Sequence, residues 1–393
     1  MLRSLASRLL PFAVFAAAWA WFAGGGEWSL MLHPDEAKVA GWTRQAHENG
    51  HVTDRVYPGG WFQIARARIC LGRTALRAKA KWRAWRVQDG AVVAVDPRTF
   101  RPPDIEPPDA ERALFATQAG RDLDAFLAAV AALAVFFASR ALGAGRAASV
   151  FAAAVLCAQH VVVEHAHYCE TDMALVAFFA IACWLFCRFL AEPGAVRACT
   201  ALFAAGFAVS CKYTLAPLLV WIPVAAGVLA AAPGRGGAAR PARRRAAHFA
   251  AYAAALSAVF AAGFLLGTPA LLRDPAWFRA SAAEMSARTY AETAGILGPF
   301  AKTRWGGPAL RAGSFVRNGA ALGWGFWTVA IAGAAAWALR RPRRQALGIP
   351  LFVAVFVAWA AFGLPWFRAQ EFLPVAVAAA IASSLAFSEA LSR

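Results

Sequence analysis

Carboxylates and imidazoles gather beside long apolar runs of this sequence, where they could act as general acids or bases. Asp35 and Glu36 follow the first apolar run, and residues 164–172 place three carboxylates and two imidazoles between two later runs. Ionisable groups at such boundaries are costly unless they bind charge or take part in chemistry. We therefore expect Asp35 and Glu36 to supply a general base. The alternative is that both residues only complement the dipole of a helix that begins at Pro34.

Two cations in otherwise apolar surroundings predict an anion-binding site. Lys212 lies between two apolar runs and is followed by Tyr213, and Arg368 precedes the last apolar run. A phosphate group is a natural partner for such charges. Lys212 could instead extend its ammonium group towards water, and Arg368 could pair with Glu371.

Histidines and carboxylates in one short segment leave a metal site open. His165, His167, Glu170 and Asp172 could together hold a divalent cation. The His-x-His spacing alone is weak evidence, so we assign no residue as a metal ligand and no cofactor as certain. The simplest alternative is a polar loop in which Asp172 caps the following helix.

The chain is far more apolar than a soluble domain, because 60% of its 393 residues are hydrophobic and its mean hydropathy is +0.49. Several runs reach the roughly 20 residues that cross a bilayer, and they are solid blocks, whereas a β-barrel would show alternation. The sequence predicts an all-α polytopic membrane protein, with about ten transmembrane helices in a single domain, residues 1–393. The expected spans are residues 5–23, 123–140, 146–163, 173–190, 197–211, 214–231, 247–267, 320–339, 347–364 and 371–388.

The distribution of arginine orients this expected bundle. The net charge is +18, but the arginines alternate with the spans and form no single basic domain, which argues against nucleic-acid binding. With the N-terminus in the cytoplasm, that side carries only two of the 22 acidic residues, Glu192 and Glu389. The Ala- and Arg-rich, Lys-poor composition favours the inner membrane of a bacterium. The same side carries sixteen arginines: Arg3, Arg8, Arg140, Arg146, Arg188, Arg197, Arg235, Arg240, Arg243, Arg244, Arg245, Arg340, Arg341, Arg343, Arg344 and Arg393.

Two long connections, residues 24–122 and 268–319, are then expected to be extracytoplasmic. Within the first, the stretch from residue 57 to residue 72 is apolar but contains Arg66 and Arg68, so we do not count it as a span; whether it enters the membrane stays open. Residues 66–86 are rich in arginine and tryptophan and are expected to lie on anionic lipid, or else to form an ordinary solvated face. The first run is interpreted as a retained anchor, with a cleaved signal peptide as the alternative.

Several short motifs, taken in order, resemble the GT-C membrane glycosyltransferases. The similarity is to the group of dolichyl-phosphate-mannose protein mannosyltransferases and aminoarabinose transferases, glycosyltransferase family 39, and it covers roughly residues 5–390. Relatives tend to continue the Tyr-Pro motif into a second span, whereas this chain carries arginines there. The motifs are His33-Pro34-Asp35-Glu36, Tyr57-Pro58, Arg121 before a span, His167-Tyr168, Thr171-Asp172, Gly206 with Lys212-Tyr213-Thr214, Thr268-Pro269, and Arg368 with Pro374.

The resemblance implies a GT-C-like fold and an inverting transfer of a sugar from a polyprenyl-phosphate donor to a hydroxyl acceptor. It implies that Asp35 deprotonates the acceptor, that Glu36 supports Asp35, that Asp172 orients the acceptor or a metal, and that Lys212 binds the donor phosphate. The acceptor could be a protein, a lipid or a glycan. The alternative function is a transporter or flippase of a lipid-linked sugar. Further expected substrate-binding residues are Tyr57, His167, Glu170, Tyr213 and Arg368.

Overall fold

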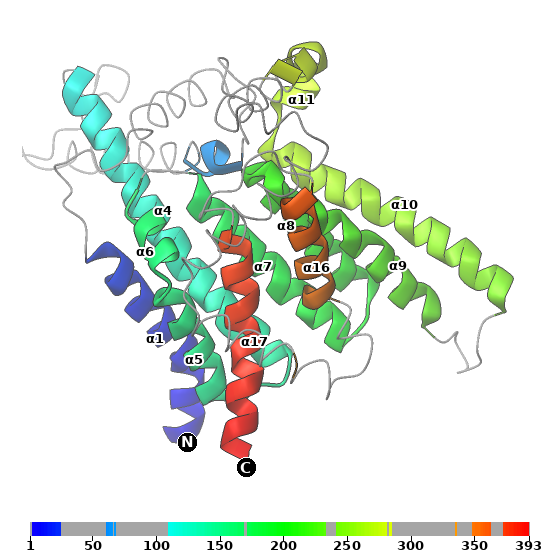
Figure 1. Ribbon diagram of the computed structural model, residues 1–393, viewed down its shortest axis with the longest axis horizontal. Coiled ribbons are helices and arrows are strands. Elements are labelled where there is room, and N and C mark those ends of the chain that lie inside the picture. The colour runs from blue at the N-terminus through cyan, green and yellow to red at the C-terminus, as the bar shows by residue number, and fades with distance from the viewer. Residues whose placement is uncertain are drawn as a thin grey trace, which may run out of the picture.

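A computed structural model of residues 1–393 shows a bundle of helices (Figure 1). All regular elements in the described part of the chain are helical, and five of these helices are long and apolar enough to cross a membrane, or six if one bent pair is counted as a span. The prediction of an all-α, multi-pass membrane protein is therefore confirmed. The structure describes residues 2–24, 60–65, 67, 109–168, 171–232, 241–280, 283–284, 335, 348–362 and 372–392.

Helices occupy nine of the ten segments that we expected to span the membrane. The tenth, residues 320–339, lies outside the described residues except for residue 335, so the number of spans stays a prediction. The elements are α1 (Leu2–Ala23), α4 (Asp109–Ala141), α5 (Arg146–Cys157), α6 (His160–Ala166), α7 (Asp172–Ala191), α8 (Ala195–Cys211), the 3-10 helix η1 (Tyr213–Val220), α9 (Trp221–Ala231), α10 (Ala242–Gly267), α11 (Ala270–Arg273), α16 (Ile349–Phe362) and α17 (Leu373–Ser392).

Three of the expected segments differ from continuous helices with the predicted bounds. The segment 146–163 is broken into α5 and α6, which meet at an angle of 65°. The Nε1–H of Trp21 in α1 donates to the carbonyl oxygen of Cys157 at 3.2 Å, so the break leaves this carbonyl with a partner. The segment 214–231 begins as η1, which contains Pro217, and becomes α-helical only at Trp221. Helix α4 begins at Asp109, well before the expected residue 123.

Helix α7 forms the centre of the bundle. It packs against α4, α8 and α17, and it is apolar on all sides, as expected of a helix that is surrounded by others. In its most apolar window 72% of the residues are buried, compared with 17% for α10, which lies at the periphery (Figure 1). The packing therefore separates a buried core from a helix that would face lipid.

The two ends of the bundle differ in charge. Both chain termini lie at one end, and the helices alternate in direction between this end and the other (Figure 1). The described arginines in the parts of the helices at the end with the termini are Arg8, Arg140, Arg146, Arg188, Arg197, Arg243, Arg244 and Arg245. The start of α7 and the last turns of α8 and α10 lie at the opposite end (Figure 1).

Glycines allow α8 and α10 to approach each other at backbone distance. A Cβ added to Gly206 in α8 would collide with the carbonyl oxygen of Phe260 in α10. A Cβ added to Gly263 in α10 would collide with the carbonyl oxygen of Phe203 in α8. Such reciprocal small-residue contacts are a common way for membrane helices to associate, because lipid supplies no hydrophobic force between them.

We expect Gly206→Ala to destabilise the protein, because the backbones must separate to accept the methyl group. Overpacking of this kind costs about 1–3 kcal/mol. Gly227→Ala in α9 is the matched control, since nothing lies within 4 Å of a Cβ added there. Thermal unfolding in detergent measures both variants. Equal midpoints for the two alanine variants would contradict the close approach of α8 and α10.

Candidate functional site

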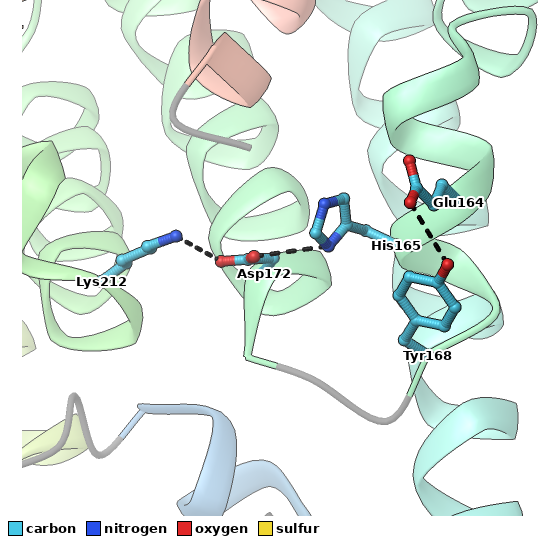
Figure 2. Close-up of polar contacts among 5 residues, drawn as sticks. All are labelled: Glu164, His165, Tyr168, Asp172 and Lys212. Carbon is cyan, nitrogen blue, oxygen red and sulfur yellow. Dashed lines mark hydrogen bonds and ion pairs between the residues drawn. The ribbon is translucent and has the colours of Figure 1, made fainter. Parts of the chain in front are cut away.

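Asp172 contacts two described side chains, Lys212 and His165, at the end of the bundle opposite the termini. The Nζ of Lys212 lies 2.7 Å from its Oδ1, and the Nδ1 of His165 lies 3.4 Å from its Oδ2 (Figure 2). The side chain of Asp172 is 4% exposed and that of Lys212 is 15% exposed. A buried carboxylate thus lies between a cation and an imidazole. We call this group the Asp172 cluster and the end of the bundle that holds it the ion-pair end.

The local geometry explains why residues 40 positions apart meet. Asp172 is the first residue of α7, and Lys212 is the first residue after α8, which runs in the opposite direction. Lys212 has an extended backbone, with φ −158° and ψ 123°, before η1 begins at the next residue. His165 lies in the last turn of α6, just before the connection to α7. Three consecutive helix ends therefore place one functional side chain each at the cluster.

The ion pair bears on the alternatives that the sequence left open for Lys212 and for Asp172. Lys212 was expected either to extend towards water or to pair with an anion, and in the structure it donates a hydrogen bond to Asp172. The alternative role of Asp172 was to cap α7, but the N-cap residue is Thr171, which makes no capping hydrogen bond with its side chain. Because a buried carboxylate without a cation is strongly destabilised, each charge in this pair depends on the other.

Buried polar atoms without a described hydrogen-bond partner also gather at the ion-pair end. The described residues contain six such side-chain atoms; four of them lie here, but the hydroxyl groups of Tyr213 and Thr268 lie close enough to pair with each other. Buried groups of this kind are normally satisfied, so a concentration of them favours a site that accepts a polar ligand. The two atoms that keep no described partner are Nε2 of His167 and Oγ1 of Thr214.

His167 is held in its neutral form at neutral pH. Burial lowers the pKa of His167 below its ordinary value, and the nearby backbone of Phe22 only partly opposes this effect. A neutral imidazole has one nitrogen that donates and one that accepts. Burial thus favours the neutral form of His167, which can exchange a hydrogen bond with a ligand.

The described residues bring no metal-binding group together. Within the part of the chain that the structure describes, no three His, Cys, Asp or Glu side chains converge on one point. His165 contacts Asp172, whereas Glu164 is exposed and accepts a hydrogen bond from the hydroxyl of Tyr168 at 3.2 Å. Glu170, the fourth residue of the expected metal set, lies outside the described residues, so the metal alternative stays open.

A second buried polar contact at this end was not anticipated from the sequence. The Nε1–H of Trp61 donates to Oδ1 of Asp124 at 2.8 Å, and both residues are buried. Arg121 is also buried, at 1% exposure, one helical turn before Asp124. The sequence could have indicated Asp124, because it is a carboxylate inside an expected span. Such residues are functional candidates by default.

Five predicted site residues cannot be placed, but the chain on either side of them can. No side-chain contact is described for any of the five, so their predicted roles stay predictions. They are Asp35, Glu36, Tyr57, Glu170 and Arg368, all outside the described residues.

Residues 25–59, which carry three of these five, leave and rejoin the described chain at the ion-pair end. They follow the end of α1, where the backbone of Phe22 lies beside His167. They end at Gly60, which packs so closely on Cys211 that a Cβ there would meet its Sγ at 2.6 Å. Both attachment points therefore lie next to the Asp172 cluster along α6 and α8.

The connection from α16 to α17, which carries Arg368, is attached to the ion-pair end as well. Helix α16 begins beside the last turn of α7, because Gly348 packs against Leu190. Helix α17 ends beside the start of α5, where the ring of Phe387 stacks on Phe151 with centroids 4.5 Å apart. Both helices therefore have their connected ends at the ion-pair end (Figure 1).

Comparison of the sequence with protein-family models and with curated proteins found no match. The resemblance to GT-C glycosyltransferases therefore stays a prediction from short motifs. The case for a function rests on the side chains that the helices bring together.

We expect the Asp172–Lys212 pair to show strong coupling in a double-mutant cycle. Asp172→Asn and Lys212→Met should each lower the unfolding midpoint, because each leaves a buried charge unpaired at a cost of about 3–5 kcal/mol. The double variant should recover most of this loss. Glu192→Gln is the control, because its exposed pair with Arg197 should contribute less than about 1 kcal/mol. Additive losses in the double variant would show that the two charges do not depend on each other.

Proposed function

We propose that this protein is an integral-membrane glycosyltransferase that moves a sugar from a polyprenyl-phosphate donor to an acceptor hydroxyl, with inversion at the anomeric carbon. The proposed site lies at the ion-pair end, on the extracytoplasmic face of the inner membrane of a bacterium. The arginines at the opposite end support this orientation through the positive-inside rule. The acceptor is a hydroxyl of a protein, a lipid or a glycan.

One observation carries the proposal. The Asp172 cluster and the connections that carry Asp35, Glu36 and Arg368 are all attached to the same end of a bundle of apolar helices. A lipid-linked donor presents its phosphate and sugar at the membrane surface, so a base and a cation that act on it must lie at one membrane level. The attachment of these connections supports such an arrangement.

The proposed reaction uses these groups as follows. Asp35 removes the proton of the acceptor hydroxyl, whose oxygen attacks the anomeric carbon from the face opposite the phosphate. The bond between the anomeric carbon and the phosphate oxygen breaks, and polyprenyl phosphate leaves with one more negative charge. Lys212 and Arg368 neutralise that charge as it develops. Glu36 supports Asp35 as the base, and Tyr57, Glu170 and Tyr213 contact the substrate.

The Asp172 cluster is suited to hold a phosphate-binding lysine in place. An ammonium group has three N–H donors, so Lys212 can donate to Asp172 and to a phosphate oxygen at the same time. Asp172 thereby fixes the direction of the lysine side chain, and His165 occupies the other carboxylate oxygen. Nearby hydroxyl groups of Tyr213, Thr214 and Thr268 offer further donors to phosphate or sugar oxygens.

A transporter or flippase of a lipid-linked sugar is the second candidate, and the break between α5 and α6 favours it. Discontinuous helices commonly form the binding sites of transporters. Such sites lie near the middle of the bilayer, however, whereas the Asp172 cluster lies at helix ends. A detergent solution separates the two functions, because it has no compartments: a transferase forms product there and a transporter does not.

We expect the purified protein in detergent to transfer sugar from a polyprenyl-phosphate donor, and Asp35→Asn to abolish the transfer without lowering the unfolding midpoint. Product formation is measured by mass spectrometry against a panel of hydroxyl acceptors. The double variant Asp172→Asn/Lys212→Met tests the role of the cation. It removes both charges of the pair together, so it leaves no buried charge unpaired. It should fold but bind the donor at least about tenfold more weakly, since a charge-assisted hydrogen bond to phosphate is lost.

Two outcomes would remove the proposal. Turnover by Asp35→Asn at the wild-type rate would exclude Asp35 as the base. Wild-type donor affinity in the stable double variant would leave Lys212 and Asp172 with a structural role alone.

A further inference from the structure

The arginine-rich end of the bundle contains an open groove between α9 and α10. Its volume is about 350 Å³, which is at the lower limit of ligand-binding clefts. Small apolar residues form most of the wall, so the surface is smooth and can accept a hydrocarbon chain. The groove is lined by Gly227, Ala230 and Ala231 of α9 and by Ala242, Arg245 and Phe249 of α10.

The positive charge beside this groove has no counterpart among the described residues. Arg243, Arg244 and Arg245 are exposed in the first turns of α10, and no described carboxylate pairs with them. The sequence contains no acidic residue between Glu192 and Asp274, so neither α9 nor α10 supplies one. The three arginines therefore present an uncompensated cationic surface.

Three other arginines at the same end have described partners. Arg197 pairs with Glu192, Arg140 donates to the carbonyl oxygen of Ala144, and Arg188 lies 6.0 Å from the ring centre of Trp184. Among the described residues, the arginines of α10 have no such partner.

The surroundings of α10 identify the class of ligand. This helix is apolar and mostly exposed, so its outer face meets lipid acyl chains when the bundle is in a membrane. Its first turns, with the arginines, then lie at the level of lipid headgroups, which attract basic clusters when they are anionic. The apolar groove matches the acyl chain of an anionic phospholipid. The arginines beside it match the negative charge of the headgroup.

We propose that the α9–α10 groove binds an anionic phospholipid, with an acyl chain along Gly227, Ala230 and Phe249 and the phosphate on Arg245. Arg243 and Arg244 add charge around the headgroup. The site lies at the end of the bundle opposite the Asp172 cluster and is independent of the proposed glycosyl transfer. It would hold α10, whose outer face is mostly exposed, against α9 in a native membrane.

The test uses the full-length protein in a neutral detergent, titrated with phosphatidylglycerol, phosphatidylcholine or inorganic phosphate. Thermal unfolding and native mass spectrometry report binding. We expect phosphatidylglycerol to raise the midpoint and to remain bound, and the other two additives to have little effect. In the variant Arg243→Gln/Arg244→Gln/Arg245→Gln the apparent Kd for phosphatidylglycerol should rise at least about tenfold.

Two further variants separate a headgroup effect from occupation of the groove. Gly227→Leu should weaken phosphatidylglycerol binding by filling the groove, because a side chain there meets open space and no neighbour. Arg146→Gln, an exposed arginine at the same end on α5, should leave binding unchanged. Equal protection by phosphatidylcholine, equal protection by inorganic phosphate, or full binding in Gly227→Leu or in the triple variant would each overturn the proposal.

Discussion

The ion-pair end of the structure depends on one buried ion pair, between Asp172 and Lys212, in a bundle whose core is mostly apolar. A carboxylate at 4% exposure is tolerated because an ammonium group lies 2.7 Å away and an imidazole contacts its other oxygen. The pair joins the start of α7 to the end of α8, so it fixes the level of these two antiparallel helices relative to each other. A ligand that binds Lys212 therefore binds a group whose position is set by the core.

The other elements at the ion-pair end are arranged around this constraint. Gly206 and Gly263 bring α10 against α8, which places Thr268 and Tyr213 at the same end as Lys212. The contact of Trp61 with Asp124 attaches a short helical part of the first long connection to the bundle. Charge is separated accordingly, because in the expected topology the other end carries only two acidic residues, Glu192 and Glu389. One end is thus suited to chemistry on a polar ligand and the other to contact with anionic lipid.

Most of the fold could be predicted from the sequence, and the site only in part. Solid apolar runs and alternating arginines predicted the helices and their directions, because bilayer thickness dictates both length and pattern. The break at α5–α6 and the 3-10 start at Tyr213 were missed, since hydropathy does not report local backbone geometry. The sequence identified Asp172 and Lys212 separately but not their contact, which depends on which helix ends pack together. Asp124 was overlooked although its position inside an apolar run was visible.

The central claim is that base, cation and lipid-linked sugar meet at the ion-pair end. The most direct measurement is an experimental structure, by electron cryomicroscopy, of the protein in a lipid nanodisc with a polyprenyl phosphate bound. We expect the phosphate within hydrogen-bonding distance of Nζ of Lys212, with Asp35 facing it from the same end of the bundle. A phosphate bound elsewhere, or Asp35 and Lys212 opening to separate cavities, would contradict the claim.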